Sequence, residues 1–169
     1  MPTPSRKQTS RPLRLYLIEA HPLVRLGFRS FFDTRPSISV VGDASTLAAA
    51  LPALQLCKPD VVITDTFPIP KAVLRRQHAL HVLYTFETLE HCSPARLTQH
   101  LKHGRAGIAL KNLPMDEFLR AVYQVAAGRG YNDPSFLRLV EEKRRRRDTV
   151  RQMRRNNGRR STEEKNSKK

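Results

Sequence analysis

The sequence predicts an α/β domain with a parallel sheet that is covered by helices on both faces. Short β-branched runs alternate with segments whose apolar residues recur at helical spacing. One run, Asp60–Asp65 (DVVITD), is apolar enough for a strand that is buried on both faces. Strands that are joined by helical crossovers form parallel sheets, so these observations together favour a doubly wound α/β fold.

The first half of the chain contains three of the predicted strands. Pro12 and the His21-Pro22 pair bound the first strand, and Pro36 stops the helix that follows it. Ser45 is the expected N-cap of the second helix. In chain order, the predicted elements are a strand at Leu13–Glu19, a helix at Pro22–Asp33, a strand at Ile38–Val41, a helix at Thr46–Leu56 and a strand at Asp60–Asp65.

The second half supplies two more strands, which makes five. Pro68 and Pro70 interrupt the chain after Asp65, and Gly128 ends the last helix of the domain. The predicted elements are one or two helical turns at Lys71–Arg76, a strand at Leu80–Thr85, a helix at Arg96–Lys102, a strand at Ala106–Lys111, a helix from Pro114 to Gly128 and a further helix from about Ser135.

Four of the five predicted strands end in a polar residue: Glu19, Asp65, Thr85 and Lys111. In open parallel sheets, functional groups gather at the carboxyl ends of the strands, near the point where the strand order reverses. Two carboxylates, a hydroxyl and an ammonium at these ends therefore predict a polar site.

Five motifs surround or follow these residues: His21-Pro22-Leu23-Val24-Arg25, Lys58–Asp65 (KPDVVITD), Val82–Thr85 (VLYT), Ala106–Lys111 (AGIALK) and Ala126–Pro134 (AAGRGYNDP). In this order and spacing they resemble the motifs of the receiver domains of response regulators, specifically the NarL/FixJ type. The resemblance covers Leu13 to Phe136, and it implies a flavodoxin-like (CheY-like) doubly wound sheet of five parallel strands.

The resemblance implies a role in two-component signalling, with a histidine kinase or another signalling protein as partner. Asp65 matches the phosphoacceptor, while Thr85 and Lys111 match the residues that bind the phosphoryl group. Mg²⁺ would be held by Glu19, by Asp65 and by the backbone carbonyl of Phe67. Cations are needed there because an anionic carboxylate attacks an anionic phosphoryl group. Protein docking, either phosphoryl-dependent or constitutive, is the implied output.

Three departures from the family pattern surround this site. Ala20 replaces an acidic residue that normally contacts Mg²⁺, so metal binding is expected to be weak. Two prolines follow Asp65, and only 19 residues separate it from Thr85, which predicts a truncated third helix. Ile108 stands where a switching aromatic residue often lies.

Structural roles remain open for the same residues. Asp65 could cap a turn, Lys111 could be a solvated strand end, and Glu19 could form a purely structural salt bridge with Lys111. His21, next to Pro22 at a helix start, is assigned a structural position. No metal site is expected at His91, Cys92, His100 and His103, because their spacing matches no known ligand motif.

The formal net charge of +16 is concentrated at the two ends. Thirteen Lys/Arg face five Asp/Glu between Glu141 and Lys169. We therefore divide the chain into a disordered basic arm (1–12), a receiver-like domain (13–130) and a basic helical or disordered tail (131–169). Tail residues suited to phosphate contact are Arg144, Arg145, Arg146, Arg147, Arg151, Arg154, Arg155, Arg159 and Arg160.

The tail leaves three functional readings open. It could bind DNA or RNA without sequence preference, with the receiver fold as a scaffold; it could be a solvated extension; or the chain could be a regulator that has lost its effector domain. No helix-turn-helix pattern follows Phe136. An independent enzyme is not expected, because no nucleophile–base pair or Gly-rich phosphate loop occurs. No membrane segment is predicted, the two cysteines suit the cytoplasm, and a homodimer is left open.

Overall fold

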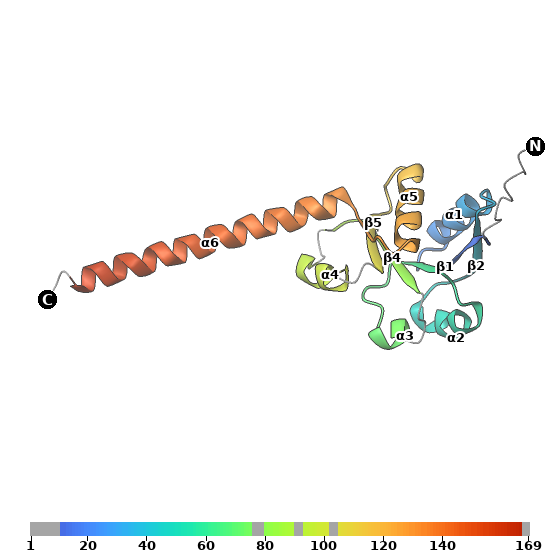
Figure 1. Ribbon diagram of the computed structural model, residues 1–169, viewed down its shortest axis with the longest axis horizontal. Coiled ribbons are helices and arrows are strands. Elements are labelled where there is room, and N and C mark those ends of the chain that lie inside the picture. The colour runs from blue at the N-terminus through green and yellow to red at the C-terminus, as the bar shows by residue number, and fades with distance from the viewer. Residues whose placement is uncertain (1–10, 76–79, 90–92, 102–104, 167–169) are drawn as a thin grey trace, which may run out of the picture.

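The computed structural model describes residues 11–75, 80–89, 93–101 and 105–166, with only the backbone at 71, 75, 100 and from 154 onward. These residues form a single parallel sheet with helices on both faces (Figure 1). The flavodoxin-like architecture that the sequence predicts is therefore confirmed. The strands are β1 Leu13–Ile18, β2 Ile38–Ala44, β3 Val61–Thr64, β4 His81–Phe86, β5 Ala106–Leu110 and β6 Tyr131–Asn132.

The helices alternate with the strands along the chain. Pro22 occupies the first turn of α1, where its missing N–H costs no hydrogen bond. The six helices are α1 Pro22–Asp33, α2 Leu47–Cys57, α3 Lys71–Arg75, α4 Pro94–Leu101, α5 Met115–Ala126 and α6 Pro134–Asn166. The single turn or so of α3 agrees with the truncated third helix that the short spacing between Asp65 and Thr85 predicts.

The strand order is β2-β1-β3-β4-β5-β6. The chain moves from β1 outward to β2, then crosses back over β1 to β3, so the order reverses between β1 and β3. At such a reversal the connections leave the sheet on opposite faces and open a crevice at the strand ends. Glu19 follows β1 and Asp65 follows β3, which places both carboxylates at this crevice.

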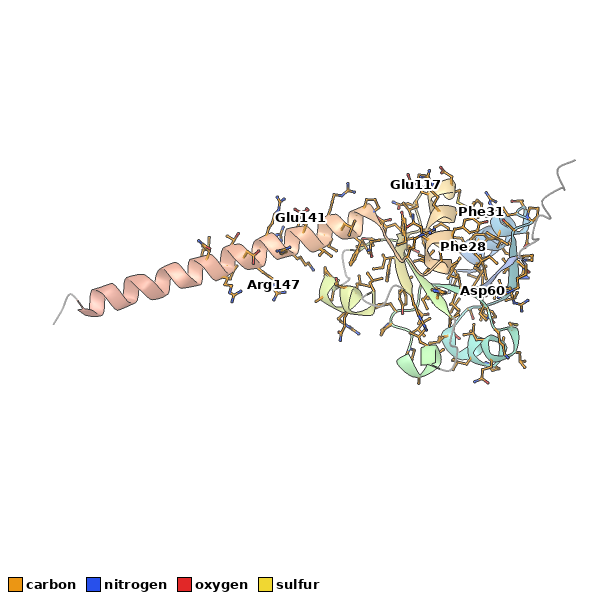
Figure 2. The ribbon with its side chains drawn as sticks, viewed as in Figure 1. Phe28, Phe31, Asp60, Glu117, Glu141 and Arg147 are labelled. Atoms are coloured by element: carbon orange, nitrogen blue, oxygen red, sulfur yellow. The ribbon has the colours of Figure 1, made fainter. Side chains whose placement is uncertain are left out.

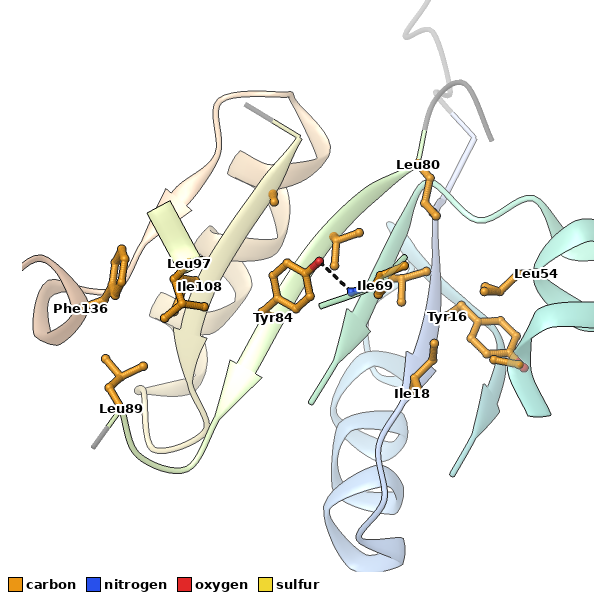
Figure 3. Close-up of a cluster of buried hydrophobic side chains, with 14 residues drawn as sticks. Tyr16, Ile18, Leu54, Ile69, Leu80, Tyr84, Leu89, Leu97, Ile108 and Phe136 are labelled. Carbon is orange, nitrogen blue, oxygen red and sulfur yellow. Dashed lines mark hydrogen bonds between the residues drawn. The ribbon is translucent and has the colours of Figure 1, made fainter. Parts of the chain in front are cut away.

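Two apolar clusters hold the helices to the sheet. One face packs the α1 and α5 side chains Phe28, Phe32 and Phe118 against β1, β3 and β4, and the Phe28 and Phe118 rings stack 5.1 Å apart. The other face gathers Leu54 of α2, Leu97 of α4 and Phe136 of α6 around Tyr16, Tyr84 and Ile108 (Figure 3). The Tyr84 hydroxyl accepts a hydrogen bond from the Ile69 backbone N–H at 3.3 Å, which satisfies a buried donor in the loop after β3.

The structure corrects the predicted strand count, because β6 adds a sixth strand that pairs with β5. A strand of two residues is too short to leave an alternating pattern in the sequence. The sheet therefore extends beyond the boundary expected at residue 130, and Phe136 lies in the core. The N-cap of α2 is also corrected: Thr46, rather than Ser45, accepts a hydrogen bond from the Ala49 N–H.

Helix α6 runs away from the domain over most of its length (Figure 1). Its 33 residues correspond to about 50 Å at 1.5 Å per residue. Its first turns pack against the domain through Phe136 and through the half-buried Leu139 and Val140. No helix in the described part of the chain is both long enough and apolar enough to cross a membrane.

Candidate phosphoryl-acceptor site

The polar residues at the strand ends are held in place by backbone hydrogen bonds that continue the sheet. The Glu19 N–H donates to the Ala44 carbonyl at 3.0 Å, the Asp65 N–H to the Ile18 carbonyl at 3.2 Å, and the Lys111 N–H to the Phe86 carbonyl at 2.8 Å. Each residue is thus fixed by the strand beside it, although each lies one position beyond its own strand. The backbone of the sheet therefore fixes the positions from which these three side chains extend.

Lys111 joins the two carboxylates. Its Nζ lies 2.8 Å from Glu19 Oε2 and 4.0 Å from Asp65 Oδ2. The Glu19 side chain is 2% exposed and that of Lys111 is 11% exposed, so this ion pair is largely removed from water. Within the described residues, Glu19 Oε2 has no hydrogen-bond partner apart from this ammonium group. The ion pair that the sequence left open as a structural alternative is therefore present.

Burial would raise the pKa of Glu19, because a buried carboxylate loses hydration. The hydrogen bond from Lys111, those from His21 and the Lys111 charge outweigh this effect, so the pKa of Glu19 is lowered. Glu19 is therefore ionised at neutral pH, and Lys111 balances its charge inside the site.

Asp65 is more accessible than Glu19, with a side chain that is 21% exposed. Its Oδ2 accepts a hydrogen bond from the Ala20 backbone N–H at 3.1 Å, and its Oδ1 accepts one from the Thr66 hydroxyl at 3.4 Å. The carboxylate is thus oriented but still open to solvent. This arrangement suits a group that meets a partner from outside the domain.

Thr85 is buried near the end of β4. It pairs in the sheet with Ala109 of β5, which precedes Lys111 by two residues. Its Oγ1 has no hydrogen-bond partner within the part of the chain that the structure describes. A buried hydroxyl without a partner costs free energy that a new acceptor can recover. The structure brings Glu19, Asp65 and Lys111 together and places Thr85 near the end of the neighbouring strand β4, while the functional roles of these four residues stay predictions.

The site offers Mg²⁺ the two carboxylates of Glu19 and Asp65, one fewer than the family pattern provides. Ala20 has no side-chain oxygen, and its N–H points a donor at Asp65. Among the described residues, the group of metal-ligating atoms within 4.8 Å of one another consists of Glu19, His21 and Asp65. The Phe67 carbonyl stays a predicted third ligand, and the Phe67 ring packs against Tyr84 at 5.0 Å between centroids.

Two residues that the sequence analysis missed also face this site. His21 was assigned a structural position, yet its Nδ1 lies 3.2 Å from Glu19 Oε1. Glu87 follows Thr85 by two residues, and its Oε1 lies 3.9 Å from His21 Nδ1 and 4.0 Å from Lys111 Nζ. His21 follows the predicted strand end Glu19 by two residues, and Glu87 follows Thr85 by two residues. This closeness to the strand ends was the signal in the sequence that could have identified them.

The predicted phosphate-contacting residues lie apart from this site, on α6. The described arginines Arg144, Arg145, Arg146, Arg147 and Arg151 are exposed, while the side chains of Arg154, Arg155, Arg159 and Arg160 fall outside the described ones. An open groove of about 1050 Å³ lies between α4 and α6. Its α6 wall carries the cations Lys143, Arg144, Arg147 and Arg151, and its α4 wall carries the neutral polar side chains Thr98 and Gln99.

Comparisons with known proteins agree with this geometry. The chain is 28% identical over 123 residues to the nitrate/nitrite response regulator NarL of Escherichia coli, covering 69% of this chain and 56% of NarL. It is 32% identical over 130 residues to the probable transcriptional regulatory protein NarL of Mycobacterium tuberculosis, covering 74% of this chain and 60% of that protein. The chain thus spans less than two thirds of these relatives.

Solved receiver domains superimpose on the same part of the chain. The signal receiver domain of the response regulator NarL from M. tuberculosis matches with a TM-score of 0.58 and 28% identity, covering 71% of this chain and all of that domain. The receiver domain of RcsB from Salmonella enterica, at 22% identity, supports the fold alone, with a TM-score of 0.63 over 76% of this chain and 99% of that domain. No family model matches the sequence.

Fold, site and relatives together define the class of protein. The described residues from Leu13 to Phe136 form a receiver domain, the signal-accepting unit of two-component response regulators. The curated relatives that this domain matches include regulators of the NarL type. The chain differs from the family pattern at Ala20 and carries the long basic helix α6 after the domain.

Proposed function

We propose that the chain is a phosphoryl-accepting signalling module that acts in the cytoplasm, with a histidine kinase as phosphoryl donor and Asp65 as acceptor. The observation that carries this proposal is the position of the Lys111 ammonium, 4.0 Å from the accessible Asp65 carboxylate. In the reaction, an Asp65 oxygen attacks the phosphorus of a phosphohistidine. The new O–P bond forms as the P–N bond breaks, and the histidine leaves with the electron pair of that bond.

Lys111 and Thr85 have separate tasks in this step. The Lys111 ammonium offsets the repulsion between the Asp65 carboxylate and the phosphoryl oxygens. The Thr85 hydroxyl, which has no partner in the described structure, donates a hydrogen bond to a phosphoryl oxygen. Satisfying that buried hydroxyl favours the phosphorylated state and couples it to the end of β4.

A divalent cation, which in this family supplies further neutralising charge, would contact Glu19 and Asp65 when bound. Because Ala20 removes one oxygen ligand, we expect weak Mg²⁺ binding. We propose protein docking, either phosphoryl-dependent or constitutive, as the output of the domain.

Incubation with acetyl phosphate, followed by mass spectrometry of the intact chain, tests the proposal. The expected result is a gain of one phosphoryl group that Asp65→Asn abolishes. Asp60→Asn is the matched control, because Asp60 lies at the opposite end of β3 and pairs with Arg11 at 2.7 Å. No gain with the wild-type chain, or the same gain with Asp65→Asn, contradicts phosphoryl acceptance at this residue.

We propose, as a second candidate function, sequence-blind contact with DNA or RNA through α6. Figure 2 shows Glu141 and Arg147 on the part of α6 that extends from the domain, and four cations line the groove beside α4. Such contacts release counterions, so the logarithm of the binding constant falls with the logarithm of salt concentration by about 0.9 per phosphate neutralised. The triple variant Lys143→Gln, Arg147→Gln, Arg151→Gln should reduce that slope on duplex DNA by about 2.7.

A further inference from the structure

A groove separates α4 from the part of α6 that lies nearest the domain. Its volume is about 1050 Å³, and both helices supply polar side chains to its walls. We propose that this groove holds a single strand of DNA or RNA, with the sugar-phosphate backbone lying between the two helices. The inference rests on the proposed nucleic-acid contact through α6, and it adds the form of the nucleic acid and a second wall in the receiver domain.

The α6 wall presents cations on one face of the helix. Lys143, Arg147 and Arg151 follow one another at intervals of four residues, so their side chains lie on successive turns of the same face. Four residues rise about 6 Å along a helix, which is close to the distance between neighbouring phosphates of an extended strand. Three successive phosphates can therefore each meet one cation, and Arg144 lines the groove beside them.

These four cations are available to an anionic ligand. All of them are exposed, and none forms an ion pair with another described residue. Arg145, which does not line the groove, instead pairs with Glu141 at 2.7 Å. Asp148 also lines the groove, so the charged lining residues carry a net charge of +3. A groove with this charge attracts phosphate groups and repels a basic segment such as a second copy of α6.

The α4 wall supplies hydrogen-bond donors without negative charge. Ser93 and Thr98 offer hydroxyl groups, Gln99 offers an amide, and all three residues are exposed. Hydroxyl and amide side chains are frequent partners of phosphate and sugar oxygens in complexes with nucleic acids. A strand in the groove would thus be contacted from both sides, whereas a duplex lying along α6 would not need α4.

The dimensions of the groove select one strand. Its α6 wall runs from Val140 to Arg151, which corresponds to about 16 Å of helix at 1.5 Å per residue. Over this length, a volume of 1050 Å³ gives a cross-section of about 60 Å², or about 8 Å across. The backbone of an extended strand fits this width. A duplex does not, because its major groove alone is about 12 Å wide.

The lining residues give no signal for particular bases. The apolar ones are Pro94, Ala95, Val140 and Val150, and no aromatic side chain is among the described residues that line the groove. Proteins that stack bases use aromatic side chains for this purpose. We therefore expect the groove to bind the backbone without preference among base sequences.

Fluorescence anisotropy with the full chain tests the inference. The probes are labelled oligo(dT) and oligo(rU) of about 12 nucleotides, a duplex of the same length, and poly-glutamate as an acidic polypeptide. We expect both single strands to bind at least about fivefold more tightly than the duplex. The logarithm of their binding constants should fall with the logarithm of salt concentration by about 0.7 per phosphate neutralised.

Variants on α6 separate the groove from the rest of the helix. Arg147→Gln should weaken oligo(dT) binding by about three- to tenfold and reduce the salt slope by about 0.7. Arg145→Gln is the matched control, because it removes the same charge from the same helix outside the groove, and it should change binding by less than about twofold. Asp148→Asn removes the negative charge from the groove and should strengthen binding.

A variant on α4 tests the second wall. Gln99→Glu places a carboxylate opposite the α6 cations, so it should weaken oligo(dT) binding by about fivefold and leave duplex binding unchanged. Gln55→Glu is the matched control, since Gln55 is an exposed residue of α2 that does not line the groove. Thermal unfolding of each variant verifies that it is folded.

The possible failures are distinguishable. Duplex binding at least as tight as oligo(dT) binding, equal losses in Arg145→Gln and Arg147→Gln, or unchanged oligo(dT) binding in folded Gln99→Glu overturns the inference, while contact through α6 stays in place. Tighter binding of poly-glutamate than of oligo(dT) overturns it in favour of an acidic protein segment. Absence of salt-dependent binding to all three nucleic acids overturns both the inference and the proposed contact.

Discussion

Two ion pairs of nearly equal length show how differently the domain and α6 use charge. Lys111 Nζ lies 2.8 Å from Glu19 Oε2 in the site, and Arg145 Nη2 lies 2.7 Å from Glu141 Oε1 on α6. The first pair is 11% and 2% exposed, whereas the second is 78% and 63% exposed. Distance alone therefore says little, because the cost of leaving a charge unpaired depends on its access to water.

The same contrast extends to packing. In the domain, helices contact both faces of the sheet, and each strand is hydrogen-bonded to its neighbours. Beyond its first turns, α6 has exposed side chains such as Val150 and Met153 and no apolar cluster among its described residues. Changes in the domain should alter cooperative unfolding, whereas changes in distal α6 should act locally.

The largest effect is expected from Lys111→Met. Removing the ammonium leaves the buried Glu19 carboxylate without its compensating charge, which should lower the free energy of unfolding by about 3 kcal/mol. Urea denaturation followed by circular dichroism measures this loss. A change below about 1 kcal/mol would mean that the pair is as weakly coupled as an exposed one.

A glycine in each region gives the next comparison. A Cβ at Gly107 of β5 would approach Val125 Cγ2 to 2.6 Å and the Tyr131 carbonyl to 3.0 Å. Gly107→Ala should therefore destabilise the domain by about 1–3 kcal/mol. Gly158→Ala lies within α6 and should have the opposite sign, stabilising that helix locally by up to about 1 kcal/mol. Chemical denaturation measures the stability of each variant, and circular dichroism measures its helical content. A change of the same sign in Gly107→Ala and Gly158→Ala would contradict the predicted difference between the domain and α6.

The third-largest effect is expected from acidification, which should weaken the stabilisation by the buried Glu19–Lys111 pair. The pKa of Glu19 is lower in the folded chain than its ordinary value, so the folded state favours the ionised form. The resulting stabilisation is present above the ordinary glutamate pKa and is lost as the pH falls through the lowered value. The free energy of unfolding, measured between pH 6 and pH 3, should therefore fall less steeply for Glu19→Gln than for the wild type. Identical pH dependence of unfolding in the wild type and in Glu19→Gln would contradict a stabilising role of the ionised Glu19.

The smallest effect is expected from Glu141→Gln, which breaks the exposed i,i+4 pair with Arg145. The free energy of unfolding should change by less than about 0.5 kcal/mol, and added salt should remove the difference. Thermal unfolding at low and high salt measures it. A loss close to that of Lys111→Met would show that α6 is coupled to the domain.

Most of the fold was predictable because its signals are local. Apolar runs such as Val61–Thr64 and the helical spacing of Phe28 and Phe32 are visible in the sequence. The strand β6 was missed because Tyr131–Asn132 is defined by pairing with β5 rather than by its own pattern. Tertiary pairing of this kind leaves almost no trace in two residues.

The clustering of polar side chains was also predictable in part. Glu19, Asp65 and Lys111 lie together because each ends a predicted strand and parallel strands end at the same edge of a sheet. The role of each residue stays a prediction. His21 and Glu87 were missed because they belong to loops, whose path depends on packing that the sequence pattern does not encode. His21 also begins a helix at Pro22, which made a structural role a sufficient explanation.

Amide chemical-shift mapping with beryllofluoride, at saturating Mg²⁺, tests the central claim that Asp65 is the acceptor of a receiver domain. We expect shifts at Thr85, Lys111 and Glu19, none along α6 from Arg144 to Met153, and loss of all of them in Asp65→Asn. Shifts that persist in Asp65→Asn, or an unchanged spectrum of the wild-type chain, would contradict it.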